Sequence, residues 1–555
     1  MFGSHSRNIM AIFWALILVV VDAEPNDDDD GGNGLPEPTG PYVTGVYDFE
    51  FTDTIYPVSR PQDADGRRIM VRTWYPACRK IYFDDVNRTC QQQPLSSSFY
   101  YMGEPRPYYA EGELEATILP QAQAMSMFID QTVLLAFFNQ TITYSYVNVP
   151  LALDLLGQGP LPMIVYSHGG LGTVSTHVAL MEEFASQGYV VFSVTHPDGS
   201  SGIQYPHGND NDNKNLTTVV RYDDAFFAQV LASLTPDPNG LSSVDIQVRY
   251  DTRRTRLEQR AFLSQYADRW KDDMMALVDY LLWNADGNQE DALLATLVDN
   301  EQGPASLIYC GHSFGGAAAG SAAHQDSRAQ AAFNLDGTHD SIDLFGQAIR
   351  IPYLTLSTQD VSLFGYSNEF FFEPLETMGM DEKVSRISVF DVAHVELTDV
   401  AFAPAQARFP VGGGRFADGM VLYQLVLDFV FGFVQEYSNT TSITTALNNN
   451  TNDVRRNIHV PFNISSLMEK YHGTVEMVDL NYVREWATMS ISSSSPLSSP
   501  SMLRGPSSTS QDDLATVEPS GSPSHSSAVM PWSLCTLMIW TSSTILAGVL
   551  VGGWM

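Results

Sequence analysis

The sequence predicts an α/β protein with a mostly parallel central sheet and helices on both faces. Short apolar runs recur between residues 163 and 391, and stretches of helical character separate them from residue 175 onward. Strands that alternate with helices pack as parallel units, and the helices cover both faces of the sheet. The chain of 555 residues is long enough for one large domain with tails.

The expected elements follow in chain order. Strands are expected near residues 68–76, 163–168, 189–195, 306–310, 331–335, 353–357 and 387–391. The clearest helices are expected over residues 176–187, 259–283, 314–324 and 419–437. Residues 85–150 lack a clear period, and we expect an inserted cap there. The aromatic side chains of this cap include Phe137, Phe138, Tyr144 and Tyr146. A cluster of aromatic residues is more often part of a core than of a lipid-binding surface.

One expected strand leads directly into a serine motif. The apolar run 306–310 precedes Gly-His-Ser-Phe-Gly at residues 311–315, and an Ala-rich helix follows. A tight strand-to-helix turn needs small residues two positions before and after the serine, and glycines stand at both. Such a turn holds the hydroxyl out of the sheet, at the positive end of the helix. The context predicts that Ser313 is a nucleophile rather than part of a plain helix cap.

A serine nucleophile needs a histidine base and an acid that orients the base. In α/β-hydrolases the three follow in the chain order serine, acid, histidine. Asp336 ends an apolar strand 23 residues after Ser313, and His394 ends another run 58 residues later. Folds of this class place functional groups where strands meet loops. We therefore expect Asp336 as the acid and His394 as the base.

Other residues compete for these two roles. Asp360 also follows a β-like run, whereas His324 lies in the helix after the serine and His339 lies close behind Asp336. The alternatives for acid and base are Asp340, Asp343, Asp360, His324 and His339. A capping or core role is the alternative for His394 itself.

An oxyanion hole is expected from an earlier strand. The apolar run from residue 162 ends in His-Gly-Gly-Leu at residues 168–171. Glycines let backbone N–H groups point into a site, where they stabilise a tetrahedral oxyanion. One donor is expected from Gly170 or Leu171, and the second from Phe314, the residue after the nucleophile.

Several motifs together resemble the plasma-type platelet-activating-factor acetylhydrolases, also called lipoprotein-associated phospholipase A2, a family of α/β-hydrolases. The motifs are Ser-His-Gly-Gly-Leu-Gly at 167–172, Val-Thr-His-Pro-Asp-Gly-Ser at 194–200, Gly-His-Ser-Phe-Gly-Gly-Ala at 311–317 and Leu-Asp-Gly at 335–337. The resemblance extends over residues 39–435 and implies the α/β-hydrolase fold. It matches Ser313, Asp336 and His394 to nucleophile, acid and base.

The resemblance implies a calcium-independent enzyme that cleaves the sn-2 ester of phospholipids with short or oxidised acyl chains. The chain departs from the family in the second glycine of His-Gly-Gly-Leu and in a longer, Asn/Asp-rich segment at residues 201–251. A generic extracellular carboxylesterase or polyester hydrolase is the alternative, decided by the loops at 85–150 and 201–251. A non-catalytic adhesion protein with an α/β-hydrolase domain is a third possibility.

The two ends of the chain predict export. Residues 1–23 have one arginine, an apolar run and small residues before Glu24, as in a secretory signal peptide. The expected order is then an acidic flexible segment at 24–38, a catalytic domain with its extension at 39–490 (core 39–435), a Ser/Pro-rich disordered stalk at 491–527 and an apolar tail at 528–555.

The apolar tail predicts attachment to a membrane. Small residues at 520–522 and a short spacer precede it, which is typical of a glycosylphosphatidylinositol (GPI) attachment signal. A retained single membrane span is the alternative. The expected location is the cell surface or the extracellular space.

Composition fits an exported glycoprotein. The formal net charge of −35 argues against nucleic acid as a partner and against electrostatic attraction to anionic lipid. Glycosylation sequons stand at Asn87, Asn139, Asn215, Asn439, Asn449 and Asn463. Cys78 and Cys90 can pair in an oxidising compartment, whereas Cys310 is expected to be buried. We expect no metal and no cofactor, because no Cys/His group has zinc spacing and no phosphate loop appears.

Overall fold

A computed structural model describes the central part of the chain. The described residues are 35–56, 66–77, 105–107, 131–147, 160–170, 172–198, 200–205, 218–220, 261–285, 305–337, 351–358, 384–389, 392–404, 419–438, 462–472 and 474–477, with single positions at 149, 151, 152, 155, 294 and 297. The expected signal peptide, the expected stalk, the apolar segment 528–555 and most of the segment 201–251 lie outside these residues, so the predictions about them stay predictions.

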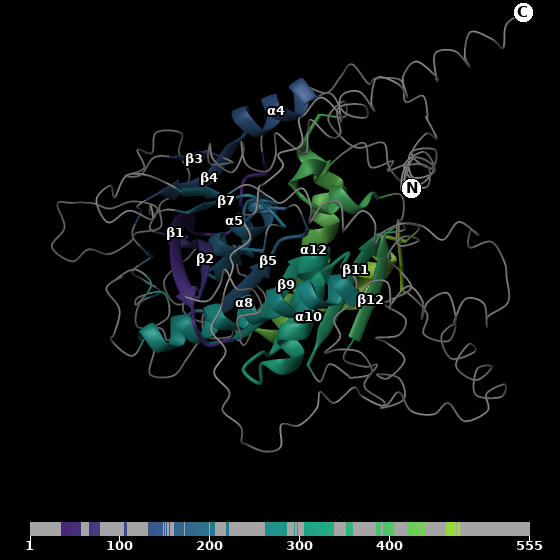
Figure 1. Ribbon diagram of the computed structural model, residues 1–555. Coiled ribbons are helices and arrows are strands. Elements are labelled where there is room, and N and C mark those ends of the chain that lie inside the picture. Colours follow the sequence, from purple (N-terminus) through teal and green to yellow (C-terminus); the bar gives the residue numbers. More distant parts are fainter. Residues whose placement is uncertain are drawn as a thin grey trace, which may run out of the picture. The chain divides into compact units, whose positions relative to one another are not determined.

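The described residues form one large mixed sheet of eleven strands in the order β13-β12-β11-β10-β9-β5-β6-β2-β1-β4-β3. Figure 1 shows β3, β4 and β1 toward the left of this sheet and β11 and β12 toward the right. The strands are β1 (Val43–Asp53), β2 (Arg67–Ala77), β3 (Pro105–Pro107), β4 (Ile142–Val147), β5 (Met163–Ser167), β6 (Val190–Val194), β9 (Leu307–His312), β10 (Ala331–Leu335), β11 (Tyr353–Thr358), β12 (Val384–Val389) and β13 (Val475–Met477). A separate pair consists of β7 (Ile203–Tyr205) and β8 (Thr218–Val220).

The middle of the sheet is parallel. Strands β6, β5, β9, β10, β11 and β12 pair in parallel with their neighbours, while β2 joins β6 and β1 joins β2 in antiparallel fashion. All residues of β5, β6, β9 and β10 are buried. Parallel strands covered on both faces read as continuous apolar runs. This burial explains why the sequence marked these strands clearly.

Helices cover the two faces of the sheet separately. Along β9, Ile308 and Cys310 pack with α5 (Val178–Ser186) and α12 (Gly419–Tyr437) in one apolar cluster. Leu307 and Tyr309 pack with α8 (Ala261–Ala285) and α10 (Phe314–Gln325) in another. Successive residues of a strand point to opposite faces, so the two clusters lie on opposite sides of the sheet. The predicted α/β-hydrolase fold, with helices on both faces, is confirmed.

The sheet extends further at the β1 edge than the sequence predicted. Strand β4 pairs in parallel with β1, and α4 (Gln131–Gln140) precedes it. Phe137 and Phe138 of α4 are buried in the same cluster as α5 and α12. The described part of the expected cap is therefore an edge of the main domain, with these two aromatic side chains in the core.

The segment around the expected base also differs from the prediction. Strand β12 ends at Val389, and His394 begins a short 3-10 helix, η5 (His394–Leu397), followed by η6 (Asp399–Phe402). Helix α14 (Ile464–Lys470) packs against α12. Among the described residues, one helix, α12, has the length and apolar composition to cross a membrane. Half of its apolar window is buried in the protein, as in a core helix.

Candidate active site

Ser313 stands at a strained turn between β9 and α10. Its backbone has φ 55° and ψ −123°, a region that a residue with a side chain adopts rarely and at a cost of about 1–3 kcal/mol. A Cβ atom added to Gly311 would lie 2.3 Å from the carbonyl oxygen of Gly315, and one added to Gly315 would lie 2.2 Å from that of Ser167. Only glycine fits at these two positions, as the motif predicted.

Ser313, His394 and Asp336 are joined by hydrogen bonds. The Oγ atom of Ser313 lies 2.9 Å from Nε2 of His394, and Nδ1 of His394 lies 2.6 Å from Oδ2 of Asp336. A carboxylate only accepts hydrogen bonds, so Nδ1 of His394 carries the proton that Asp336 accepts. The Nε2 atom then has a lone pair that can accept the hydroxyl proton of Ser313. This arrangement can convert the hydroxyl into a nucleophile.

Asp336 is held by the neighbouring strand. The backbone N–H of Thr358 donates to Oδ1 of Asp336 at 2.7 Å, and the Thr358 hydroxyl donates to Oδ2 at 2.5 Å. Asp336 has φ 53°, and its own N–H donates to Leu356 of β11. The ends of β10 and β11 together fix both oxygens of the carboxylate opposite the imidazole of His394.

His312 contacts both the backbone carbonyl and the ring of His394, the expected base. Its Nε2 atom lies 3.2 Å from the carbonyl oxygen of His394, and the two rings are 4.7 Å apart between centroids. Burial is the main cause that lowers the pKa of His312 well below its usual value, so the ring is neutral. A neutral imidazole can donate one N–H to a carbonyl, which orients the backbone of His394. The sequence alone did not predict this role for His312, which is the residue before Ser313 in the Gly-His-Ser-Phe-Gly motif.

The expected oxyanion donors lie on two elements near Ser313. Phe314 is the first residue of α10, where a helical N–H has no intrahelical partner. Gly170 is exposed in the turn after β5, and Leu171 lies outside the described residues. The turn approaches the nucleophile closely, because a Cβ atom added to Gly169 would lie 2.9 Å from Cβ of Ser313.

The residues of this site lie within the part of the chain that matches a known protein family. The family model described as "Platelet-activating factor acetylhydrolase, isoform II" matches residues 32–406. The chain belongs to this acetylhydrolase family. The match includes all three residues of the hydrogen-bonded relay and agrees with the resemblance found in the motifs. Membership in this family supports ester hydrolysis as the activity of the chain.

The chain was also compared with solved structures and with curated proteins. A ferulic acid esterase from Streptomyces cinnamoneus, whose structure was solved at 2.4 Å resolution, is similar to this acetylhydrolase-family chain with 19% sequence identity and a TM-score of 0.45. The similarity covers 73% of this chain and 92% of the esterase. No curated protein matches the chain.

Among the competing residues, only His324 is described by the structure. It lies near the end of α10, which begins directly after Ser313, so three turns of helix separate the two residues. The other competitors, Asp340, Asp343, Asp360 and His339, lie outside the described residues.

Among the residues that the structure describes, no group of three or more His, Cys, Asp or Glu side chains could hold a metal ion.

The expected modification sites are mostly outside the described residues. Asn87, Asn215, Asn439, Asn449, Cys78 and Cys90 all lie there. Asn139 is in α4, and Asn463 is exposed at the start of α14, where its side chain accepts a hydrogen bond from the N–H of Ser466. Cys310 is buried and free, as predicted.

Proposed function

We propose that this acetylhydrolase-family chain is a serine hydrolase that cleaves the sn-2 ester of phospholipids with short or oxidised acyl chains, without calcium. The observation that carries the chemistry is the relay from Ser313 through His394 to Asp336 at the turn between β9 and α10. The short-chain phospholipid substrate is supported by the family and by the motifs that the chain shares with it.

In the proposed reaction, Oγ of Ser313 attacks the ester carbonyl while Nε2 of His394 takes the hydroxyl proton. The negative charge that develops on the carbonyl oxygen is stabilised by backbone N–H groups of Phe314 and of Gly170 or Leu171. The proton then passes from His394 to the leaving alcohol oxygen of the lysophospholipid. An acyl-enzyme remains on Ser313.

Water completes the cycle by the reverse sequence of proton transfers. His394 accepts a proton from water as the oxygen attacks the acyl carbonyl, and returns it to Oγ of Ser313 as the ester breaks. Asp336 holds the imidazole in one tautomer and stabilises its charged form. The products are a free short-chain acid and the lysophospholipid.

We further propose that the protein is exported and held at the cell surface. The support is in the sequence: an apolar segment behind one arginine at residues 1–23, and small residues before the apolar segment 528–555. Glycosylation is proposed at the six sequons. Of these, Asn463 is exposed in the structure, and its Oδ1 accepts the capping hydrogen bond, which leaves Nδ2 available for a sugar.

A panel of phospholipids tests the substrate class. The purified chain is assayed with sn-2 acetyl, sn-2 oxidised short-chain and sn-2 long-chain phosphatidylcholines, each with and without a calcium chelator. We expect the first two to be cleaved at the sn-2 position, with no effect of the chelator. Cleavage of simple aryl esters or polyesters, with all three phospholipids untouched, would support the carboxylesterase alternative. No ester hydrolysis at all would support an adhesion protein.

A further inference from the structure

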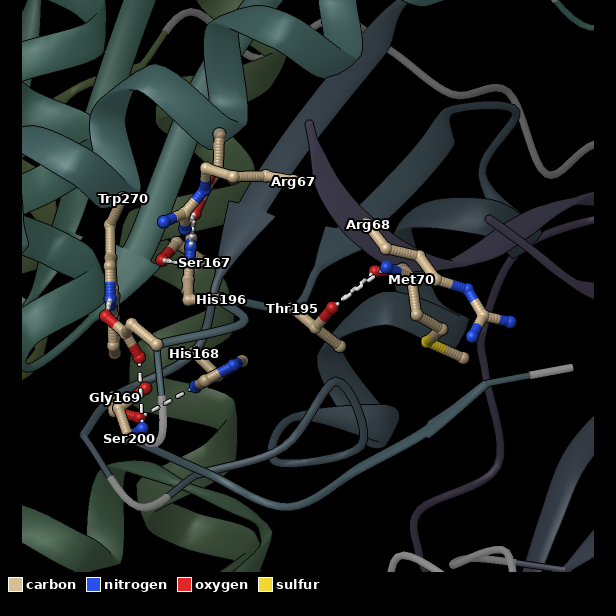
Figure 2. Close-up of polar contacts among 12 residues, drawn as sticks. Arg67, Arg68, Met70, Ser167, His168, Gly169, Thr195, His196, Ser200 and Trp270 are labelled. Atoms are coloured by element: carbon tan, nitrogen blue, oxygen red, sulfur yellow. Dashed lines mark hydrogen bonds and ion pairs between the residues drawn. The ribbon is translucent and has the colours of Figure 1, made fainter. Parts of the chain in front are cut away.

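A second Ser–His–Asp relay begins at Ser167, the residue directly before the turn at 168–171; Figure 2 labels this serine and the histidine of the relay, His196. The Oγ atom of Ser167 is 2.8 Å from Nε2 of His196, whose Nδ1 is 2.9 Å from Oδ2 of Asp273. Arg67 donates two hydrogen bonds to the carboxylate of Asp273, at 2.8 and 2.7 Å. The relay joins the end of β5, the segment after β6, helix α8 and the start of β2.

This second relay has no access to substrate. Ser167, His196 and Asp273 are each 0% exposed. Burial is the main cause that lowers the pKa of His196 to about 3, so its ring is neutral at physiological pH. Asp273 accepts the proton on Nδ1, and Nε2 accepts the hydroxyl proton of Ser167. The Ser167 hydroxyl is therefore fixed as a donor in the interior, which suits a structural link and not a nucleophile.

The ring of His196 is part of an aromatic stack that reaches the active site. The rings of His196 and Trp270 are parallel within 6°, with centroids 4.0 Å apart. The indole N–H of Trp270 donates to Oδ2 of Asp198 at 2.6 Å, which fixes the plane of the indole. The same indole makes an edge contact with Phe314, at 4.7 Å between centroids. One expected oxyanion donor thus belongs to a residue that packs on Trp270.

His168 connects this stack to the other expected donor. Its ring lies 5.2 Å from the rings of both His196 and Trp270. Its Nδ1 atom lies 2.8 Å from the carbonyl oxygen of Gly169, a bond drawn in Figure 2. Burial is the main cause that lowers the pKa of His168 to about 3, so the ring has one proton. Because a carbonyl only accepts, that proton is on Nδ1.

The hydrogen bond from His168 sets the orientation of a peptide group. Gly172 also donates its N–H to the Gly169 oxygen, at 2.9 Å, so this oxygen is held by two donors. In a trans peptide the C=O and the following N–H point in opposite directions. Holding the Gly169 oxygen toward His168 therefore turns the N–H of Gly170 away from the buried stack. No described residue accepts that N–H, and the neighbouring Gly169 lies against Ser313.

We propose that His168 is a positioning residue that directs the Gly170 N–H at the oxyanion, and that the buried relay of Ser167, His196 and Asp273 holds His168 in place. The proposal selects Gly170 over Leu171 as the donor. It rests on the proposed function, since an oxyanion forms only when Ser313 attacks an ester. It also gives the buried relay a task in catalysis without contact with substrate.

A pair of substitutions separates the hydrogen bond of His168 from its packing. His168→Phe keeps an aromatic ring and removes the N–H donor, whereas His168→Asn loses the ring and keeps a donor at the position of Nδ1. Both are assayed on p-nitrophenyl acetate, after the active fraction is counted by complete labelling with a fluorophosphonate. His324→Asn, at the far end of α10, is the matched control.

We expect kcat per labelled site of His168→Phe to fall by about 10- to 100-fold, with KM nearly unchanged. A misdirected donor stabilises the transition state less and leaves the binding of the substrate unaffected. His168→Asn should retain kcat within about 5-fold, and His324→Asn should match the wild type. A trifluoromethyl ketone, which forms a hemiketal oxyanion on the serine, should bind His168→Phe more weakly by the same factor as kcat/KM falls. The shape of the pH profile of kcat/KM should not change.

The possible results discriminate clearly. Equal losses of kcat in the Phe and Asn variants would overturn the proposal, because packing alone would then explain them. Normal kcat per labelled site in His168→Phe would also overturn it, and would leave the proposed function intact. A wild-type chain that neither reacts with the fluorophosphonate nor cleaves the ester would refute the proposed function itself. Ser167→Ala, which removes one link of the relay, should show a smaller change in the same direction as His168→Phe.

Discussion

Thr358 holds both carboxylate oxygens of Asp336, one through its backbone N–H at 2.7 Å and the other through its hydroxyl at 2.5 Å. Oδ2, which accepts from the Thr358 hydroxyl, also accepts from Nδ1 of His394. The carboxylate therefore cannot rotate without loss of several hydrogen bonds. This relationship explains how a residue at the end of β11 takes part in orienting a histidine on η5.

The first prediction follows from this carboxylate. Asp336→Asn should lower kcat by about 10³- to 10⁴-fold, because the imidazole of His394 loses the partner that sets its tautomer. Thr358→Val keeps the backbone N–H and the side-chain shape but removes the hydroxyl, and should cost about 10-fold. Steady-state kinetics on a short-chain ester measure both.

Asp360→Asn is the matched control for Asp336→Asn, since Asp360 also follows β11 and was the main competitor for the acid. We expect a far smaller loss of kcat for Asp360→Asn. If Asp360→Asn were the more damaging of the two, the acid would be misassigned while the fold would stand.

The second prediction concerns the turn that presents Ser313. A Cβ atom at Gly315 would lie 2.2 Å from the carbonyl oxygen of Ser167, a backbone atom that cannot move aside easily. Gly315→Ala should therefore lower the free energy of unfolding by about 1–3 kcal/mol or more. Gly170→Ala is the control for stability, because a Cβ atom there has nothing within 4 Å. Equal Tm values for the two variants in thermal unfolding would contradict the tight turn.

The third prediction concerns a buried carboxyl group on α5. Glu182 accepts a hydrogen bond from the hydroxyl of Ser145, and burial is the main cause that raises its pKa to about 8 from 4.5. Between these two pH values the unfolded chain releases a proton that the folded protein keeps. The contribution of Glu182 to the free energy of unfolding therefore falls as pH rises from about 4.5 to 8.

Glu182→Gln removes this dependence, because the amide is neutral at every pH. The Tm of Glu182→Gln minus the Tm of the wild type should become more positive between about pH 5 and pH 8. Thermal unfolding at several pH values measures the difference. A difference that stays constant over this range would mean that Glu182 is ionised in the folded protein.

The fourth prediction concerns the proposed surface anchor. If the segment 528–555 is exchanged for a glycolipid near Ser520, phosphatidylinositol-specific phospholipase C should release active protein from the surface of cells that display it. Mass spectrometry of the mature protein should then find no peptides from residues 532–555. Recovery of those peptides, together with resistance to the lipase, would favour a retained membrane span.

The sequence predicted the centre of the fold well because the central strands are buried on both faces. Strand β10 and helix α12 have the predicted bounds, residues 331–335 and 419–437. Strand β4 was not predicted because its inward positions are polar. Thr143 and Ser145 are buried there, and Ser145 bonds to Glu182, so two of the buried positions are polar and give no apolar signal in the sequence.

The candidate site was predicted where local motifs carry it. Ser313 stands in a motif with strict local geometry, so the sequence predicts it directly. Asp336 and His394 were predicted from the chain order and from their place at strand ends, and other residues remained candidates for both roles. The buried relay was not predicted, because Ser167, His196 and Asp273 are distant in the sequence and meet only after β5, β6 and α8 pack together. No local pattern marks Trp270 or Asp273, three residues apart on one face of α8.

The central claim is that Ser313 is the nucleophile of an ester hydrolase. The most direct measurement is the reaction of the purified chain with a fluorophosphonate, followed by mass spectrometry of its peptides. The account predicts one label per chain on Ser313, loss of ester hydrolysis in proportion to labelling, and a Ser313→Ala variant that folds, is not labelled and loses activity by about 10⁴-fold or more. A label on another residue, or a Ser313→Ala variant that keeps about a tenth of the activity, would contradict it.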